Sequence, residues 1–313
     1  MSAAATATPG ADALTGVLPL RTRGNRDDRD FARAALLFDS LSKFARPGTF
    51  RRIIVMTPPD EVELVGERIR RWSRLPLTVV DENEIEPGLR RFADISGWTR
   101  QQILKLAVSR HIDSPFYITF DADVICTHAI DAKLLLPGGK ALMQLMPKAA
   151  VPNRLHWWRA SARILRLPKR LDEPGMAPTP AILSTEACHR LLARLQRLAA
   201  PDSWIEMLVE PLRDRAWQQY LPWYKRLYRW SEYSLYYLYC QDAGLIQRYH
   251  AIGGTERLPP LLSENCVWFD SEFERFDAAQ LFAETDPALF ALVQSNIHLD
   301  PGLVRAKVEP FLA

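Results

Sequence analysis

Two carboxylates one residue apart, Asp121 and Asp123, follow an apolar stretch near the middle of the chain. The run at 116–120 is β-branched and aromatic, which is typical of a strand inside a sheet. Because a strand buried on both faces does not hold two charges, we expect both carboxylates just past its carboxyl end, where open α/β sheets bind ligands. Carboxylate oxygens are ligands of Mg²⁺ and Mn²⁺, usually shared with substrate phosphates. The pattern predicts a divalent-cation site, and an exposed turn that happens to contain Asp-x-Asp is the alternative.

Strands and helices alternate along the chain before this pair. The residue patterns predict strands at 17–21, 53–56, 77–80 and 116–120, with helices at 31–44, 60–72 and 98–110 between them. This alternation predicts an α/β, Rossmann-like fold: a mostly parallel sheet with helices on both faces.

The third of these helices is expected to begin beside the carboxylates, with Ser96 as its N-cap. A crossover helix starts at the carboxyl edge of the sheet, and helix N-termini attract anions. Trp98, Gln102 and Lys105 share one face of this helix. The face suits a nucleotide diphosphate, and a solvated helix face with an interfacial Trp remains the alternative.

The second half of the chain is more helical and more aromatic. One stretch, at 289–293, fits a strand or a helix, because Asp286-Pro287 is a good helix start. The expected strands are 141–146, 181–183, 266–269 and 289–293, and the expected helical stretches are 185–198 and 204–239.

The composition limits the kinds of protein that this sequence can be. The 313 residues carry a net charge of +3 from 40 basic and 37 acidic side chains, which does not indicate a nucleic-acid binder. The four cysteines form neither a zinc pattern nor a disulfide framework, so a reducing compartment is expected. Residues 1–16 read as a disordered tail rather than a signal peptide. No stretch reaches the length of a membrane span, and we expect a cytoplasmic protein.

Glu232 and His298 are two further candidate site residues. Ser231 is a candidate N-cap for a helix that begins at Glu232, so the carboxylate is expected at a helix start. There it either stabilises the helix electrostatically or acts on an acceptor hydroxyl as a base. His298 is an acceptable Mn²⁺ ligand, and a polar loop residue near the C-terminus is its alternative interpretation.

An aromatic stripe precedes Glu232 and has three interpretations. It fits a core helix, a surface that stacks on sugars, or a basic amphipathic helix in peripheral contact with the inner face of the membrane. Its members are Trp217, Tyr220, Leu221, Tyr224, Leu227 and Tyr228.

The sequence resembles nucleotide-sugar glycosyltransferases of the A-type fold, and most of all a bacterial group of uncharacterised, glycosyltransferase-like domains. The resemblance covers about residues 17–310. It is carried by Gly-Trp-Thr-Arg-Gln-Gln-Ile-Leu-Lys-Leu at 97–106, Tyr-Ile-Thr-Phe-Asp-Ala-Asp at 117–123, Ala-Pro-Thr-Pro-Ala-Ile-Leu-Ser at 177–184, Ser-Glu-Tyr-Ser-Leu-Tyr at 231–236 and Gln-Ser-Asn-Ile-His at 294–298.

The resemblance implies a metal-dependent transferase with a nucleotide-sugar donor and a glycan or lipid-linked acceptor. Asp121, Asp123 and His298 would hold Mn²⁺ or Mg²⁺. Donor-binding residues would be Gly97, Trp98, Gln102 and Lys105, and Glu232 would be the catalytic residue. Residues 17–313 would form one domain, with the donor bound by 17–150 and the acceptor by 151–313. One departure is that His298 is not followed by the Gly-x-x-Lys of glycogenin-like retaining enzymes.

Other interpretations of the Asp-x-Asp pair remain open. A haloacid-dehalogenase-like phosphatase also uses Asp-x-Asp after a strand, but there it usually follows the first strand. A nucleotidyltransferase also places a metal on a nucleotide. A catalytically silent binder of sugar nucleotides would keep the same fold, because fold does not determine activity.

Overall fold

The computed structural model describes residues 13–22, 29–149, 154–213, 224–297 and 299–313. The strands are β1 Leu14–Pro19, β2 Phe50–Thr57, β3 Leu77–Asp81, β4 Phe116–Thr119, β5 Val124–Cys126, β6 Ala141–Met143, β7 Leu145–Pro147, β8 Pro174–Met176, β9 Ala181–Ser184, β10 His250–Ile252 and β11 Phe290–Leu292. The helices are α1 Arg29–Phe44, α2 Val62–Ile69, α3 Glu82–Ile85, α4 Gly97–Ala107, α5 Ala132–Leu135, α6 Leu155–Leu165, α7 Thr185–Ala199, α8 Trp204–Val209, α9 Tyr224–Tyr228, α10 Glu232–Asp242, α11 Ile246–Tyr249, α12 Asp270–Phe273, α13 Ala278–Leu281 and α14 Pro301–Val308.

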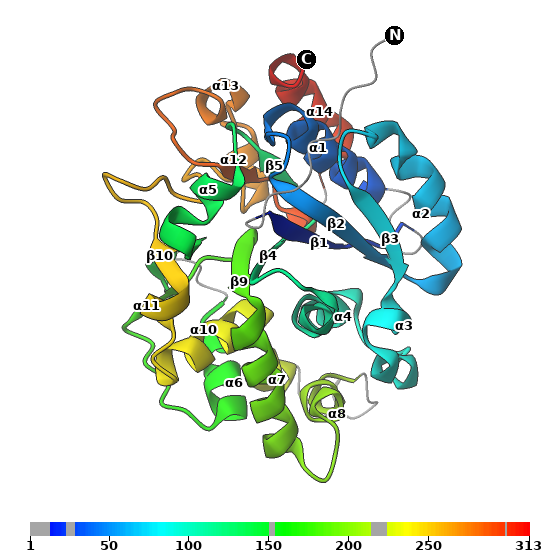
Figure 1. Ribbon diagram of the computed structural model, residues 1–313, viewed down its shortest axis with the longest axis vertical. Helices are drawn as coiled ribbons and strands as arrows, with labels where there is room; N and C mark the ends of the chain where they lie inside the picture. Colours follow the sequence, from blue (N-terminus) through cyan, green and yellow to red (C-terminus); the bar gives the residue numbers. More distant parts are fainter. Residues whose placement is uncertain (1–12, 23–28, 150–153, 214–223, 298) are drawn as a thin grey trace.

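A five-stranded sheet with the order β3-β2-β1-β4-β9 organises the molecule (Figure 1). Its first four strands are parallel, and β9 pairs antiparallel with β4. All four residues of β4 are buried, as their apolar and β-branched side chains predict for a strand covered on both faces. The predicted α/β fold with a mostly parallel sheet is confirmed.

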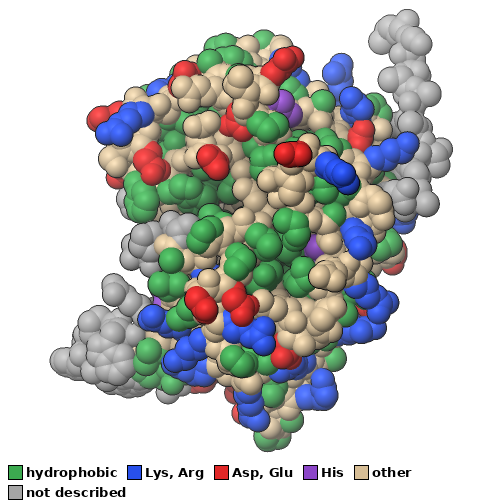
Figure 2. Space-filling view, turned by 90° about the vertical axis from the view of Figure 1, so that its left-hand side faces the viewer, with side chains coloured by type: hydrophobic (Ala, Val, Ile, Leu, Met, Phe, Trp, Pro, Cys, Tyr) green, Lys and Arg blue, Asp and Glu red, His purple; other side chains and the backbone are tan. Residues whose placement is uncertain are grey.

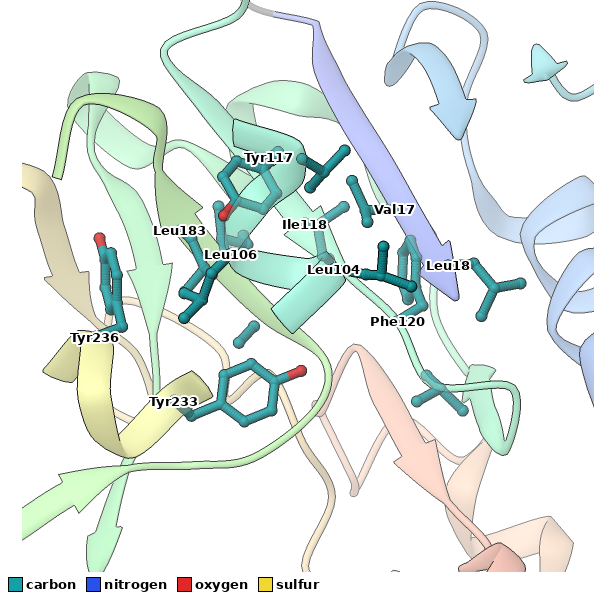
Figure 3. Packing of buried hydrophobic residues seen from close by; sticks show 14 of the residues in the cluster. Val17, Leu18, Leu104, Leu106, Tyr117, Ile118, Phe120, Leu183, Tyr233 and Tyr236 are labelled. Carbon is teal, nitrogen blue, oxygen red and sulfur yellow. The ribbon is translucent and has the colours of Figure 1, made fainter. Parts of the chain in front are cut away.

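Helices cover both faces of this sheet. Figure 1 shows α1 and α2 on one face, with α4, α7 and α10 on the other. Figure 3 shows Leu104 and Leu106 of α4 packed among Val17, Ile118 and Leu183 of the strands. These side chains are almost completely excluded from water. Burial of this kind contributes about 1.5 to 3 kcal/mol for each large apolar side chain, so it fixes α4 firmly against the sheet.

Three two-stranded ribbons join the second half of the chain to the first. In one of them β11 pairs antiparallel with β5, the strand that directly follows the carboxylate pair. The others pair β6 with β10 and β7 with β8. Through the first ribbon, residues near 295 are brought to the end of β4.

Several boundaries differ from the sequence expectations. Strand β1 begins at Leu14, so the predicted tail at 1–16 extends too far, and residues 1–12 lie outside the described ones. The stretch predicted as one strand at 141–146 is divided between β6 and β7. No strand forms at 266–269, where Val267 makes only an isolated bridge to Val293.

The second half of the chain contains helices and short strands where it is described. The predicted helices at 185–198 and at the start of 204–239 correspond to α7 and α8, and 289–293 contains the strand β11. Trp217, Tyr220 and Leu221 of the aromatic stripe lie outside the described residues. Within the described residues, no helix is both long enough and apolar enough to cross a membrane.

Candidate active site

A cleft of about 1520 Å³ opens at the carboxyl ends of β1 and β4. Its walls come from the end of β1, the first turn of α4, the start of α6, the first turn of α10 and the segment that follows β11. Asp121, Asp123 and Glu232 all line it. The parallel sheet therefore places its polar strand ends in one cavity, as expected for an open α/β sheet.

Asp121 and Asp123 lie at the floor of this cleft and are held differently. The Asp121 backbone N–H donates to Thr179 Oγ1 at 3.0 Å, and Asp121 Oδ1 accepts from Lys105 Nζ at 2.5 Å. The backbone N–H of Ser295 donates to Asp123 Oδ2 at 2.7 Å. Asp123 Oδ1 is buried and has no hydrogen-bond partner among the described residues. One oxygen of the Asp123 carboxylate is therefore buried and unpaired among the described residues.

The electrostatics of Asp123 favour a cation beside it. Burial, together with the negative charge of Asp121, raises the pKa of Asp123 to about 6, although the Ser295 N–H opposes the shift. A divalent cation bound here would offset the repulsion between the two carboxylates and would give Asp123 Oδ1 a partner. The two carboxylates fit Mg²⁺ or Mn²⁺, which proteins often bind through one or two carboxylates plus substrate phosphates.

His298, the third predicted metal ligand, lies outside the described residues. Among the described residues, no group of three or more His, Cys, Asp or Glu side chains is placed to hold a metal ion.

Lys105 does not line the cleft as a free donor-binding cation. Its side chain is completely buried, and Nζ donates to Asp121 at 2.5 Å, to Glu232 Oε1 at 2.9 Å and to Tyr233 Oη at 3.2 Å. Burial lowers the pKa of Lys105, but the charges of Asp121 and Glu232 outweigh it and raise that pKa well above its usual value. Trp98 and Gln102 of the predicted α4 face line the cleft, whereas its Lys105 end is buried against α10 and away from open solvent.

Glu232 stands at the first position of α10, as predicted. Ser231 caps the helix: its Oγ accepts from the Ser234 backbone N–H, and Ser234 Oγ accepts from the Ser231 backbone N–H. Glu232 is completely buried, and its Oε2 has no partner among the described residues. Burial raises the pKa of Glu232, although Lys105 opposes the shift. The side chain thus presents one paired and one free oxygen at the cleft.

The other residues predicted to bind the donor lie at the start of α4. Gly97 and Trp98 line the cleft, and Ser96 caps the helix by accepting from the Thr99 N–H. Gln102 is buried, lines the cleft and accepts the Glu232 backbone N–H at 3.2 Å. The structure therefore joins α4 and α10 directly behind the carboxylates.

One wall of the cleft is a stack of arginine and tryptophan side chains, of which sequence reasoning assigned only Trp98 to the site. Arg229 lies 4.4 Å from the Trp98 ring, Trp98 lies 5.5 Å from Trp157, and Arg154 lies 5.0 Å from Trp157 and 4.5 Å from Trp268. Burial lowers the pKa of Arg154 to about 10, although Asp121 and Asp123 counteract it. The density of Trp and Arg at 154–163 was the available signal.

This fold is one that glycosyltransferases also use. The chain is similar to mouse xyloside xylosyltransferase 1 in its apo form, with a TM-score of 0.50 and 12% identity over 91% of this chain and 98% of that chain. It is also similar to galactosyltransferase LgtC in complex with donor and acceptor sugar analogs, with a TM-score of 0.43 and 10% identity over 90% of this chain and 87% of that chain.

The family itself is defined by sequence. A family model described as "Family of unknown function (DUF6492)" matches residues 11–313, so the chain belongs to that family. No curated protein matches the sequence.

Proposed function

We propose that this protein is a metal-dependent glycosyltransferase that moves a sugar from a nucleotide-sugar donor to the hydroxyl of a glycan or lipid-linked acceptor. The observation that carries the proposal is the cleft-lining pair Asp121 and Asp123, in which one buried Asp123 oxygen has no partner. The fold supports the proposal by analogy, because a xylosyltransferase shares it.

The donor diphosphate would lie at the carboxylate pair. Asp121 and Asp123 would hold Mn²⁺ or Mg²⁺, and His298 is proposed as a further ligand. When bound, the cation offsets the negative charge that develops on the departing diphosphate. Gly97 and Trp98 line the same cleft at the start of α4, where free N–H groups favour an anion.

Glu232 would act on the acceptor hydroxyl. The acceptor oxygen forms its bond to the anomeric carbon, and the bond from that carbon to the diphosphate oxygen breaks. The hydroxyl proton passes to the free Oε2 of Glu232, while Lys105 holds Oε1. A raised carboxyl pKa suits a general base at neutral pH. In a retaining reaction the same oxygen anchors the hydroxyl instead.

A thermal-shift screen tests the donor site. We expect one of UDP, GDP, CDP or ADP, or a sugar nucleotide derived from it, to raise the melting temperature only when Mn²⁺ is present. A ligand at a hundredfold excess over its dissociation constant stabilises the folded state by about 2.7 kcal/mol. Asp123→Ala should abolish the Mn²⁺-dependent shift.

Asp113→Ala is the matched control, because Asp113 is exposed, outside the cleft and without a side-chain bond to the described residues. It should respond to nucleotide and Mn²⁺ as the unmodified protein does. Undiminished Mn²⁺-dependent binding by Asp123→Ala would contradict the proposed donor site.

A further inference from the structure

The helical side of the cleft carries a concentration of positive charge, which we call the basic wall. Arg159 and Arg163 lie one turn apart on α6, and Arg154 directly precedes that helix. The members of the basic wall are Arg154, Arg159, Arg163, Lys169 and Arg229, and all of them line the cleft. Figure 2 shows Lys and Arg side chains gathered on the lower half of the face that it draws.

Among the described residues, the basic wall makes no ion pair, although the charges of Asp121 and Asp123 act on Arg154. None of its five members forms a salt bridge with an Asp or Glu among the described residues. Arg163 donates only to a backbone carbonyl, that of Leu227, at 2.8 Å. Desolvation lowers the pKa of Arg229, whose guanidinium stacks on Trp98.

The acidic side chains that line the cleft are otherwise engaged. Asp30 pairs with Arg33 at 2.7 Å, and Asp121 and Glu232 share Lys105. The negative charges of Asp121 and Asp123 also act on Arg154, which can therefore serve the donor phosphates as well. The argument rests on the other four cations of the basic wall, which have no such second role.

The surface between these cations is suited to sugar rings. Trp98 and Trp157 form a tilted pair with ring centroids 5.5 Å apart, and both line the cleft. Aromatic faces carry partial negative charge and attract the C–H groups on a sugar ring. Trp157 Nε1 is buried without a hydrogen-bond partner among the described residues, so this donor is left unsatisfied.

We propose that the acceptor is an acidic glycan, whose phosphate or carboxylate groups lie along the basic wall while its sugars contact Trp98 and Trp157. This inference rests on the proposed glycosyl transfer and names the class of acceptor. Guanidinium groups recognise both phosphate and carboxylate oxygens through paired N–H donors. An anionic membrane surface would use the same charges, but these cations line a recessed cleft, which suits a chain that enters it.

Binding of matched tetrasaccharides, measured by tryptophan fluorescence in the presence of Mn²⁺ and the nucleotide, tests the inference. The probes are maltotetraose, maltotetraose bearing phosphate esters, and tetragalacturonate. We expect at least one acidic probe to bind more tightly than maltotetraose, with an affinity that falls as salt is raised. Whichever acidic probe binds better identifies phosphate or carboxylate as the recognised group.

The double variant Arg159→Gln/Lys169→Gln removes two cations that are exposed and make no hydrogen bond to the described residues. It should weaken acidic-probe binding by about 3- to 30-fold, as expected for two exposed charge contacts. Arg197→Gln/Arg257→Gln is the control, because both residues are exposed and outside the cleft. It should bind like the unmodified protein.

Three outcomes would overturn the inference. The first is binding of maltotetraose as tight as that of both acidic probes, and the second is full affinity of the basic-wall variant for them. The third outcome is basic-wall-dependent sedimentation with phosphatidylcholine–phosphatidylglycerol vesicles without discrimination among the glycans, which would assign the charges to a membrane surface. Failure of Mn²⁺-dependent nucleotide binding in the unmodified protein would instead contradict the proposed function itself.

Discussion

Lys105 links the two ends of the candidate site at the scale of single residues. Its ammonium group contacts Asp121 at the metal side and Glu232 at the acceptor side. A buried charge is tolerable only with partners of opposite charge, so these three groups depend on one another. The sequence predicted Asp121 and the helix that carries Lys105 at the same edge of the sheet, and it predicted Glu232 only as the start of another helix. The mutual contact of the three groups depends on how α10 packs on α4, and residue spacing carries no information about that packing.

Replacing Lys105 should expose this dependence. Lys105→Met leaves the Glu232 carboxylate buried without its partner, and we expect the free energy of unfolding to fall by about 3 to 5 kcal/mol. Adding Glu232→Gln removes the unpaired charge and should restore part of that loss. Urea unfolding of both variants measures the difference. If the double variant is no more stable than Lys105→Met, the loss of stability does not come from an unpaired Glu232 carboxylate.

At the scale of elements, two helix starts position the site. Ser96 and Ser231 cap α4 and α10, and both caps were predicted from the sequence because Ser followed by helix-forming residues is a local signal. Strand β4, which ends two residues before Asp121, was predicted from another local signal, its apolar and β-branched residues. The pairing of β5 with β11, which brings Ser295 to Asp123, joins residues far apart in sequence and was not predictable from either segment alone.

The cap of α10 should matter for turnover as well as stability. Ser231→Ala and Ser203→Ala each remove an N-cap bond, the second from α8, whose cap lies outside the cleft. Each substitution should cost about 1 kcal/mol of unfolding free energy. Only Ser231→Ala should also slow transfer, because Glu232 directly follows it. Equal transfer rates in the two variants would show that the α10 cap does not contribute to catalysis.

At the scale of the whole molecule, buried apolar residues from Leu14 to Val308 form one cluster. The alternation of strands and helices predicted the sheet, and its carboxyl edge predicted where the carboxylates would meet. The basic wall was not predicted. Its members come from α6 and the residue before it, the following loop and the segment before α10, so only the folded chain brings them to one side of the cleft.

Overall stability should depend on pH through His250. Burial lowers the pKa of His250 to about 4, and its Nε2 lies 2.8 Å from Tyr236 Oη. Between pH 4 and the ordinary His pKa of about 6.5, the unfolded chain binds a proton that folded His250 does not. The free energy of unfolding should therefore fall by up to about 3 kcal/mol as pH drops through this window.

Denaturant unfolding at several pH values, compared with His250→Gln, measures this contribution. The variant should be less stable at neutral pH but should lose less stability on acidification. A variant with the same pH slope as the unmodified protein would place the acid-sensitive group elsewhere.

Release of nucleoside diphosphate from a sugar nucleotide tests the central claim most directly. With the donor found by thermal shift and an acceptor present, the protein should release the diphosphate only when Mn²⁺ or Mg²⁺ is added. Glu232→Gln should bind donor and Mn²⁺ normally while its transfer rate falls by about 10²- to 10⁴-fold, the usual contribution of a general base. Mn²⁺-dependent donor binding without any release of diphosphate would contradict the account and indicate a silent binder, and phosphate release from simple phosphomonoesters would indicate a phosphatase.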